Sequence, residues 1–246
     1  MGDTQLSTPR TDDLQMLTIL MPAHNEEQII AAAVMEWHTE VISRLPGAWL
    51  LVIDDASTDG TAQELSRLAD TLPRMSFIRR PVNGGHGQAL LTGFRQIDTE
   101  FIFQTDSDRQ HRPKDFWRLW ELRGQCDFVF GVRSKRQDGV FRRVVATLMR
   151  VLIWVLWQVW VTDANCPFKL MRNRALASVL RRIPEEAFIP MVMVAILARR
   201  LRYRVAEVSV QHLPRRGGTQ SLHGLGRWWR VAWRCACQLT RLRLRE

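Results

Sequence analysis

The feature that most constrains the fold is a repeated alternation of apolar runs with amphipathic segments. Apolar runs end at residues 22, 55, 80 and 106, and the first three are followed by a polar loop and a stretch with helical spacing. Strands that alternate with helices through short loops form parallel sheets with right-handed crossovers. The sequence therefore predicts an α/β fold with a mostly parallel sheet flanked by helices.

Polar and acidic residues follow each of these apolar runs. They occupy residues 24–27 (HNEE), 54–60 (DDASTDG), 83–87 (NGGHG) and 105–108 (TDSD). Ligands of open α/β sheets lie outside the carboxyl ends of the strands. We expect these four loops to converge on one ligand site.

The pair Asp106 and Asp108 is the clearest candidate for metal binding. Two carboxylates one residue apart after a strand suit a hard cation such as Mg or Mn that bridges a diphosphate, and Gln110 offers a further oxygen. The same pattern also occurs in simple turns and helix caps, so the pair alone leaves both readings open. An acid at the end of another strand, Asp55, suits hydrogen bonds from a ribose or base. The absence of GxGxxG disfavours a nicotinamide site.

Composition limits the partners. An apolar fraction of 46% with 24% charged residues predicts a packed core, and 246 residues suffice for one sizeable domain. A net charge of +10 predicts anionic partners, which include nucleotide phosphates, anionic lipids and nucleic acid. We expect a disordered lead over 1–14, one domain over 15–221 and a basic helix over 222–246.

Two tryptophan- and arginine-rich stretches bear on membrane contact. The uncharged stretch 151–162 is shorter than the roughly 20 residues of a membrane-spanning helix, so it is either a buried core helix or an interfacial one. In the C-terminal stretch, helical spacing places the basic side chains on one face and the apolar ones elsewhere. The basic set is Arg227, Arg230, Arg234 and Arg241, and the apolar set is Trp229, Trp233 and Ala236.

The order of these motifs resembles glycosyltransferase family 2, which has the Rossmann-like GT-A fold, and within it the polyprenyl-phosphate sugar transferases. The resemblance spans most of the chain. It is carried by five segments, residues 22–27 (PAHNEE), 53–61 (IDDASTDGT), 83–89 (NGGHGQA), 106–113 (DSDRQHRP) and 131–133 (GVR).

The resemblance implies roles for individual residues. The implied nucleoside contacts are Pro22, His24, Glu26, Ile53 and Asp55, and His24 stands where the family usually has tyrosine. Asp106, Ser107 and Asp108 are implied to bind the diphosphate of the nucleotide sugar, and Asp106, Asp108 and Gln110 to bind the metal. His24, His86 and His111 are otherwise expected to make polar contacts.

Two later segments resemble the lipid-phosphate branch of the family. Residues 163–170 (DANCPFKL) are similar to its Asp...Cys-Gly-Phe-Lys segment, and residues 207–221 to its Glu-Val-Pro-Val...Arg-x-x-Gly-x-Ser segment. By that resemblance Arg133 and Arg215 face the acceptor and donor phosphates, where a guanidinium fork is apt. Pro167, Ser209 and Ser221 depart from the pattern of this branch. These departures leave open the identity of the donor and the contacts to the acceptor phosphate.

The sequence thus predicts an inverting glycosyltransferase that moves a hexose from a GDP-mannose- or UDP-glucose-type donor to a polyprenyl phosphate. Because a phosphate is already ionised, it needs little help from a base. The alternative is a family 2 enzyme with a hydroxyl acceptor and a carboxylate base, for which Asp163 is the candidate. A non-enzymatic basic module with a decayed site is the third hypothesis. We expect the protein to be cytoplasmic and peripheral on the inner face of the membrane, with an anionic membrane surface as a partner. We expect no nucleic-acid partner, and a membrane-anchored partner subunit is left open.

Overall fold

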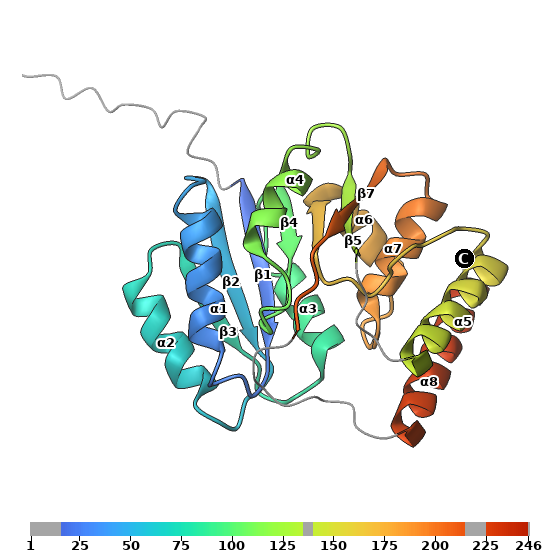
Figure 1. The fold of residues 1–246 in the computed structure, drawn as a ribbon, viewed down its shortest axis with the longest axis horizontal. Helices are drawn as coiled ribbons and strands as arrows, with labels where there is room; N and C mark the ends of the chain where they lie inside the picture. The colour runs from blue at the N-terminus through green and yellow to red at the C-terminus, as the bar shows by residue number, and fades with distance from the viewer. Residues whose placement is uncertain (1–15, 135–139, 215–224, 246) are drawn as a thin grey trace, which may run out of the picture.

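The computed structural model describes residues 16–134, 140–214 and 225–245, and within these ranges seven strands form one sheet flanked by helices (Figure 1). Arg215 and the segment 217–221 lie outside the described residues, as do residues 1–14 and 222–224. The strand order is β3-β2-β1-β4-β6-β5-β7. The strands are β1 (Leu17–Ala23), β2 (Ala48–Asp54), β3 (Met75–Arg79), β4 (Phe101–Gln104), β5 (Phe128–Arg133), β6 (Lys169–Arg172) and β7 (Val205–Val210).

The sheet is parallel except for β6, which runs antiparallel to both β4 and β5. The carboxyl ends of the parallel strands therefore share one edge of the sheet, at the bottom of Figure 1, and β6 begins at that edge. The prediction of a mostly parallel α/β sheet is confirmed. The short β6 brings its first residue, Lys169, to the edge where the other strands end.

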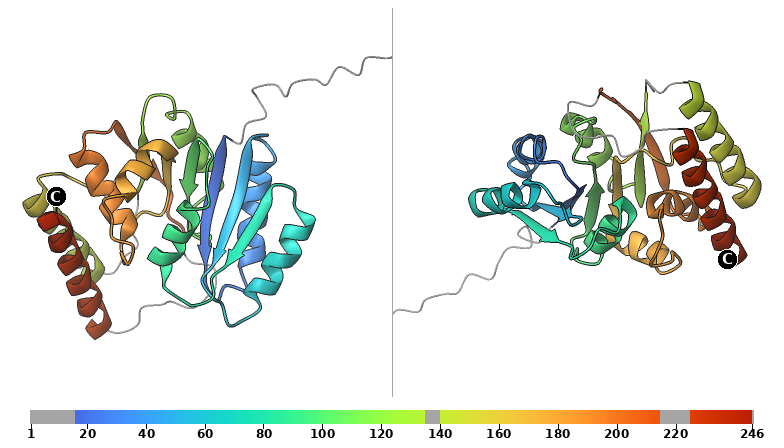
Figure 2. Two further views of the ribbon diagram at one scale, coloured as in Figure 1. Left: turned by 180° about the vertical axis from the view of Figure 1, so that it is seen from behind. Right: turned by 90° about the horizontal axis from the view of Figure 1, so that it is seen from below.

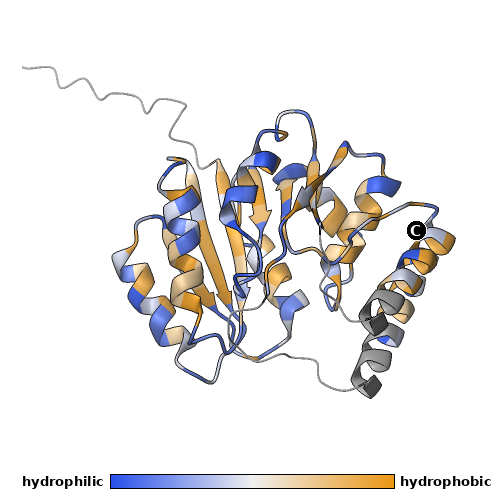
Figure 3. Cartoon of the chain, in the orientation of Figure 1, coloured by the Kyte–Doolittle hydropathy of each residue, from blue (hydrophilic) through white to orange (hydrophobic). Residues whose placement is uncertain are grey.

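Two apolar cores pack against opposite faces of the sheet, because neighbouring residues of each strand point to opposite sides. Leu17, Ile19 and Met21 belong to one core, whereas Leu20 belongs to the other. Helices α1 (Ile30–Trp37), α2 (Thr61–Thr71) and α4 (Phe116–Trp120) cover the first face. Helices α3 (His86–Phe94), α6 (Asn173–Leu180) and α7 (Pro190–Arg200) cover the second. Figure 3 shows the apolar strands between helices with polar outer faces.

The long helices α5 (Val140–Trp157) and α8 (Leu225–Arg245) lie side by side at the β7 side of the molecule (Figures 1 and 2). Ile153 and Trp157 of α5 are buried with Leu239 and Leu242 of α8 in the second core. Residues spaced three to four apart on one helix share a face, so Leu239 and Leu242 form a buried face on the described part of α8. None of the described helices has the length and apolarity needed to cross a membrane.

Candidate active site

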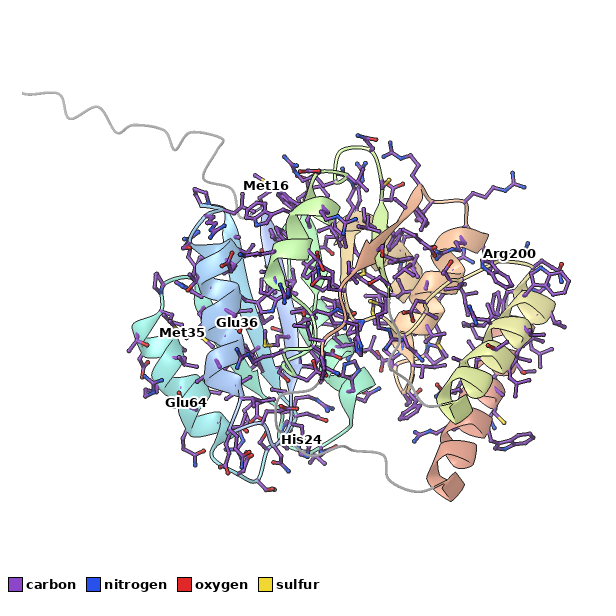
Figure 4. The ribbon with its side chains drawn as sticks, in the orientation of Figure 1. Met16, His24, Met35, Glu36, Glu64 and Arg200 are labelled. Carbon is purple, nitrogen blue, oxygen red and sulfur yellow. The ribbon has the colours of Figure 1, made fainter. Side chains whose placement is uncertain are left out.

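The end of β1 places His24 beside the end of β2, and Figure 4 labels it at the lower edge of the sheet. His24 Nδ1 lies 2.9 Å from the carbonyl oxygen of Asp55, and Nε2 lies 3.0 Å from Asn83 Nδ2. A ring that donates from Nδ1 and accepts at Nε2 satisfies both partners. Pro22 and Ile53 are directly opposed in the parallel pair of strands. Three of the predicted nucleoside contacts thus lie together.

The loops after β1 and β2 are held together by hydrogen bonds between side chains and backbone. The Glu26 N–H donates to Thr61 Oγ1 at 2.8 Å, and the Gly60 N–H donates to Glu27 Oε2 at 2.8 Å. Asn25 accepts a 2.8 Å hydrogen bond from the Thr58 N–H. The polar residues of the two motifs therefore fix the shape of this end of the site before any ligand contact.

The carboxylate of Asp55, predicted to hold the nucleoside, is used within the protein. The Gly84 N–H donates to Oδ1 at 3.1 Å, the Gly85 N–H donates to Oδ2 at 2.7 Å, and Arg80 donates to Oδ1. Gly85 has a φ of +81°, which glycine tolerates better than other residues. Asp55 thus shapes the loop that precedes α3, and a nucleoside would share this carboxylate with Arg80.

His86, the first residue of α3, contacts the candidate metal ligand Asp106. Its Nε2 lies 3.0 Å from Asp106 Oδ1, and the two side chains are 55% and 27% exposed. Burial alone would raise the pKa of Asp106, but the charge and hydrogen bond of His86 outweigh it and hold that pKa below its ordinary value. Desolvation by the surrounding loops lowers the pKa of the half-exposed His86, but the carboxylates of Asp106, Asp108 and Asp55 outweigh this effect and raise that pKa. Asp106 is therefore poised as a carboxylate.

The rest of the acidic loop is tied to the segment that follows β7. Asp108 Oδ1 accepts a 3.0 Å hydrogen bond from the Gln110 N–H, and Gln110 Nε2 donates to the Leu213 carbonyl at 3.0 Å. The Leu213 N–H donates back to the Gln110 carbonyl at 2.8 Å. Ser107 between the two aspartates is buried. The acidic loop and the chain leading toward residue 215 are thus neighbours.

Arg133 at the end of β5 forms a two-pronged ion pair with Asp163. Nε donates to Oδ2 at 2.8 Å and Nη2 donates to Oδ1 at 2.8 Å, and the side chains are 15% and 2% exposed. A planar guanidinium matches a carboxylate in this way. The residue named as candidate base in the alternative mechanism is therefore a partner of the candidate phosphate-binding arginine.

His111, which follows the acidic loop, is buried against Phe168, with 5.3 Å between ring centroids. Burial is the main reason why its pKa falls to about 4, although Asp106 acts in the opposite direction. An imidazole with that pKa is neutral at pH 7, and in this wall of the site the His111 ring lies between those of Phe168 and His212.

The sequence did not predict three features of the site. These are the contact of His86 with Asp106, the ion pair of Asp163 with Arg133, and the placement of Gln104 and Lys169 opposite each other on neighbouring strands. The position of His86 at the start of a helix after a strand was a usable signal for its place at the ligand edge. The partners of the other groups depend on how segments distant in the sequence pack.

The family model of glycosyl transferase family 2 matches residues 18–180. The chain belongs to glycosyl transferase family 2. The match contains the acidic loop and both ends of the Arg133–Asp163 pair. The family resemblance and the fold are thus confirmed.

This family 2 chain is similar to undecaprenyl-phosphate 4-deoxy-4-formamido-L-arabinose transferases. It is 28% identical to the one from Pectobacterium atrosepticum over 212 residues, which is 85% of this chain and 63% of the relative. It is 26% identical to the one from Serratia proteamaculans, and the match covers 85% of this chain and 63% of that relative. The chain therefore spans about three fifths of the length of these relatives.

Solved structures share the fold at low identity. Glucosyl-3-phosphoglycerate synthase from Mycobacterium tuberculosis, solved with Mn2+, uridine diphosphate and phosphoglyceric acid, gives a TM-score of 0.71 at 18% identity over 93% of this chain and 78% of that one. A mannosyltransferase from Pyrobaculum calidifontis, solved with GDP-Man and Mn2+, gives a TM-score of 0.64 at 20% identity over 94% of this chain and 64% of that one. At such identities the likeness establishes the fold of this family 2 chain.

Proposed function

We propose that this chain transfers a sugar from a nucleoside diphosphate to a polyprenyl phosphate, with inversion at the anomeric carbon. The observation that supports this best is the arrangement at the carboxyl edge of the sheet, where Asp106 and the buried pair of Arg133 and Asp163 all lie close enough to Lys169 to act on its charge. The family and the names of the curated relatives support a transferase with a lipid-phosphate acceptor. A hexose of the GDP-mannose or UDP-glucose type is the donor class proposed.

A divalent metal, Mg or Mn, fits the acidic loop. Within the described part of the chain no three histidine, cysteine or acidic side chains gather around one point. Magnesium sites that bind substrate phosphates need only one or two protein carboxylates, because phosphate and water complete the shell. Asp106 and Asp108 supply such carboxylates, and Gln110 would add its amide oxygen. The metal would offset the negative charge that develops on the departing diphosphate.

The remaining residues bind and orient the two substrates. His24, Glu26 and the Asp55 loop would hold the nucleoside, and the contact with His86 orients the carboxylate of Asp106. We propose that Arg133, fixed by Asp163, binds the acceptor phosphate, and that Arg215, outside the described residues, faces the donor phosphate. A phosphate oxygen attacks the anomeric carbon in line as the bond to the nucleoside diphosphate breaks, and positioning supplies most of the rate.

The state of Asp163 favours a phosphate acceptor over a hydroxyl acceptor. A hydroxyl must lose its proton in the reaction, so it needs a general base with an accessible carboxylate oxygen. Both oxygens of Asp163 accept hydrogen bonds from Arg133 at 2.8 Å. A carboxylate held in this way is a poor base. The guanidinium has five N–H donors, of which these two bonds use two, so Arg133 remains a suitable phosphate ligand.

Contact with an anionic membrane surface is proposed for the side formed by α5 and α8. Trp154 of α5 and Trp233 of α8 are 50% and 74% exposed there, and α5 also exposes Leu148 and Val151. Trp160, three residues after the end of α5, is 58% exposed. Tryptophan favours the head-group level of a bilayer, and a net charge of +10 adds attraction to anionic lipid. We propose that the chain works on the cytoplasmic face of the membrane, alone or with a membrane-anchored partner subunit.

The membrane proposal is tested by flotation with anionic vesicles. Trp154→Ser and Trp233→Ser together should reduce the bound fraction severalfold. Met35→Ser is the matched control, because Met35 is a 43% exposed apolar residue on the opposite side of the molecule (Figure 4). Equal binding by the double variant and the control would remove this surface as the membrane contact.

Sugar transfer is tested with radiolabelled nucleotide sugars, polyprenyl phosphate, and Mg or Mn, by counting label in the organic phase. One donor should label the lipid, EDTA should abolish the transfer, and Asp106→Asn should do the same in a folded protein. Label that never enters the lipid, despite nucleotide-sugar binding in a thermal-shift panel, would refute the lipid acceptor.

A further inference from the structure

A cavity of about 100 Å³ lies next to Asp106, among the start of α3, the end of β4, the start of β6 and the start of α7. Its walls include His86, Gln104 and Lys169 as well as Asp106. Gly87 fixes one wall, because a Cβ there would lie 2.6 Å from the Phe188 carbonyl oxygen. The backbones of α3 and of the segment before α7 therefore meet in close contact.

Gln104 lines this cavity and carries an unpaired, buried hydrogen-bond acceptor. The residue is 1% exposed, and its buried Oε1 has no hydrogen-bond partner within the part of the chain that the structure describes. Buried polar atoms in folded proteins are nearly always paired, because leaving one unpaired is costly. Gln104 therefore suits a ligand that brings a donor.

Lys169 supplies donors from the neighbouring strand. It is paired with Gln104 in the antiparallel register of β4 and β6, so both side chains leave the same face of the sheet. Lys169 is 1% exposed, and its Nζ donates to the carbonyl oxygens of Ala164, at 3.2 Å, and of Cys166. An ammonium group has three N–H donors, so two such bonds leave capacity for a ligand oxygen.

The order of the strands indicates which part of the donor reaches this cavity. The predicted nucleoside contacts lie at the ends of β1 and β2, and the acids that suit a diphosphate follow β4. The next strand in the sheet is β6, which carries Lys169. A sugar attached to the far phosphate would therefore lie at β6. A hydroxyl group both donates and accepts, which matches the pairing of an amide oxygen with an ammonium.

We propose that Gln104 and Lys169 select the transferred sugar: Gln104 Oε1 accepts a hydrogen bond from a sugar hydroxyl, and Lys169 Nζ donates one to the same or an adjacent oxygen. This inference rests on the proposed function and adds the residues that read the sugar. Gln104 can be changed without removing the hydrogen bonds that Lys169 makes to the 164–166 backbone, so it is the residue to test.

The experiment measures kcat/KM for the donor that the wild type uses and for each of its single-deoxy counterparts. One deoxy donor should be about tenfold or more poorer with wild type. Gln104→Met should lower kcat/KM for the parent donor by a similar factor. For that deoxy donor, kcat/KM of Gln104→Met should equal that of wild type. Gln88→Met is the control, because Gln88 Nε2 donates to the Glu185 carbonyl at 2.7 Å outside the cavity lining, and any loss should be equal for all donors.

If Gln104→Met lowers kcat/KM by the same factor for all donors, or does not lower it at all, the inference is overturned. The proposed function would still stand in either case. If wild type binds nucleotide sugars but transfers none to lipid, the same variants and deoxy donors in isothermal titration test Gln104 separately from the acceptor. Absence of nucleotide-sugar binding by wild type would overturn both.

Discussion

Removing Asp163 separates a positioning role for this residue from a role as general base. The Asp163 side chain is 2% exposed and that of Arg133 is 15% exposed. The guanidinium donates two hydrogen bonds of 2.8 Å to the carboxylate, and the backbone N–H of Arg133 donates a third at 3.3 Å. Loss of one partner of such a buried pair costs about 3–5 kcal/mol of unfolding free energy. Asp163→Ala should lose about this amount, and Asp163→Asn, which keeps one acceptor, about 1.5–3 kcal/mol.

Urea denaturation checks these values, and a double-mutant cycle with Arg133→Met isolates the pair. The coupling free energy should fall in the range of about 0.5–3 kcal/mol. Glu185→Ala is the control, because Glu185 pairs with Arg95 at 3.0 Å with 81% and 55% of the two side chains exposed, and such surface pairs contribute about 0–1 kcal/mol. The same Asp163 variants should raise KM for the polyprenyl phosphate.

A different set of results would refute this reasoning. If Asp163→Ala unfolds within about 0.5 kcal/mol of wild type, the pair does not stabilise the fold. If Asp163→Asn also lowers kcat without changing KM for the acceptor, and removes an acidic limb from the pH–rate profile, Asp163 is a base. The acceptor would then be a hydroxyl.

Three further predictions follow from single residues. Gly87→Ala should lower stability by about 1–3 kcal/mol in urea melts, because its Cβ would lie 2.6 Å from a backbone oxygen of Phe188; an unchanged midpoint would show that α3 and α7 separate easily. The pKa of His111 is lowered to about 4 in the folded protein, so as the pH falls the unfolded chain binds a proton at this residue before the folded chain does. The free energy of unfolding should therefore drop by up to about 3 kcal/mol between pH 6.5 and 4, and His111→Leu should make that drop smaller. Asp106→Asn and Asp108→Asn should each weaken Mn-dependent binding of nucleoside diphosphate about tenfold or more in titration calorimetry, and equal binding with and without Mn in wild type would argue against the metal.

Most of the fold could be predicted from the sequence because it depends on local patterns. The apolar runs ending in acids placed Asp55, Asp106 and Asp108 at one edge, and the structure confirms that edge. The antiparallel strand β6 was not predicted, since Lys169–Arg172 is short and bounded by charged residues. Its direction depends on pairing with β4 and β5, which no local pattern encodes.

The stretch that follows Arg150 shows why burial is harder to predict than helicity. The sequence left open a core helix or an interfacial one, and α5 has a buried side and an exposed side: Trp157 is 1% exposed, whereas Trp154 is 50% exposed. Packing against α8, far along the chain, decides which side is buried. Asp55 is a comparable case, because its bonds to Gly84 and Gly85 depend on how the loop before α3 folds back.

The most direct measurement compares polyprenyl phosphate with the corresponding polyprenol of equal chain length as acceptors, using one labelled nucleotide sugar. The phosphate is ionised and needs no base, and Arg133 offers it a charged partner, so label should enter the polyprenyl phosphate and leave the polyprenol unlabelled. Mass spectrometry of the product should show the sugar attached through phosphate. Transfer to the polyprenol, or to a water-soluble sugar in preference to the phosphate, would contradict the proposed function.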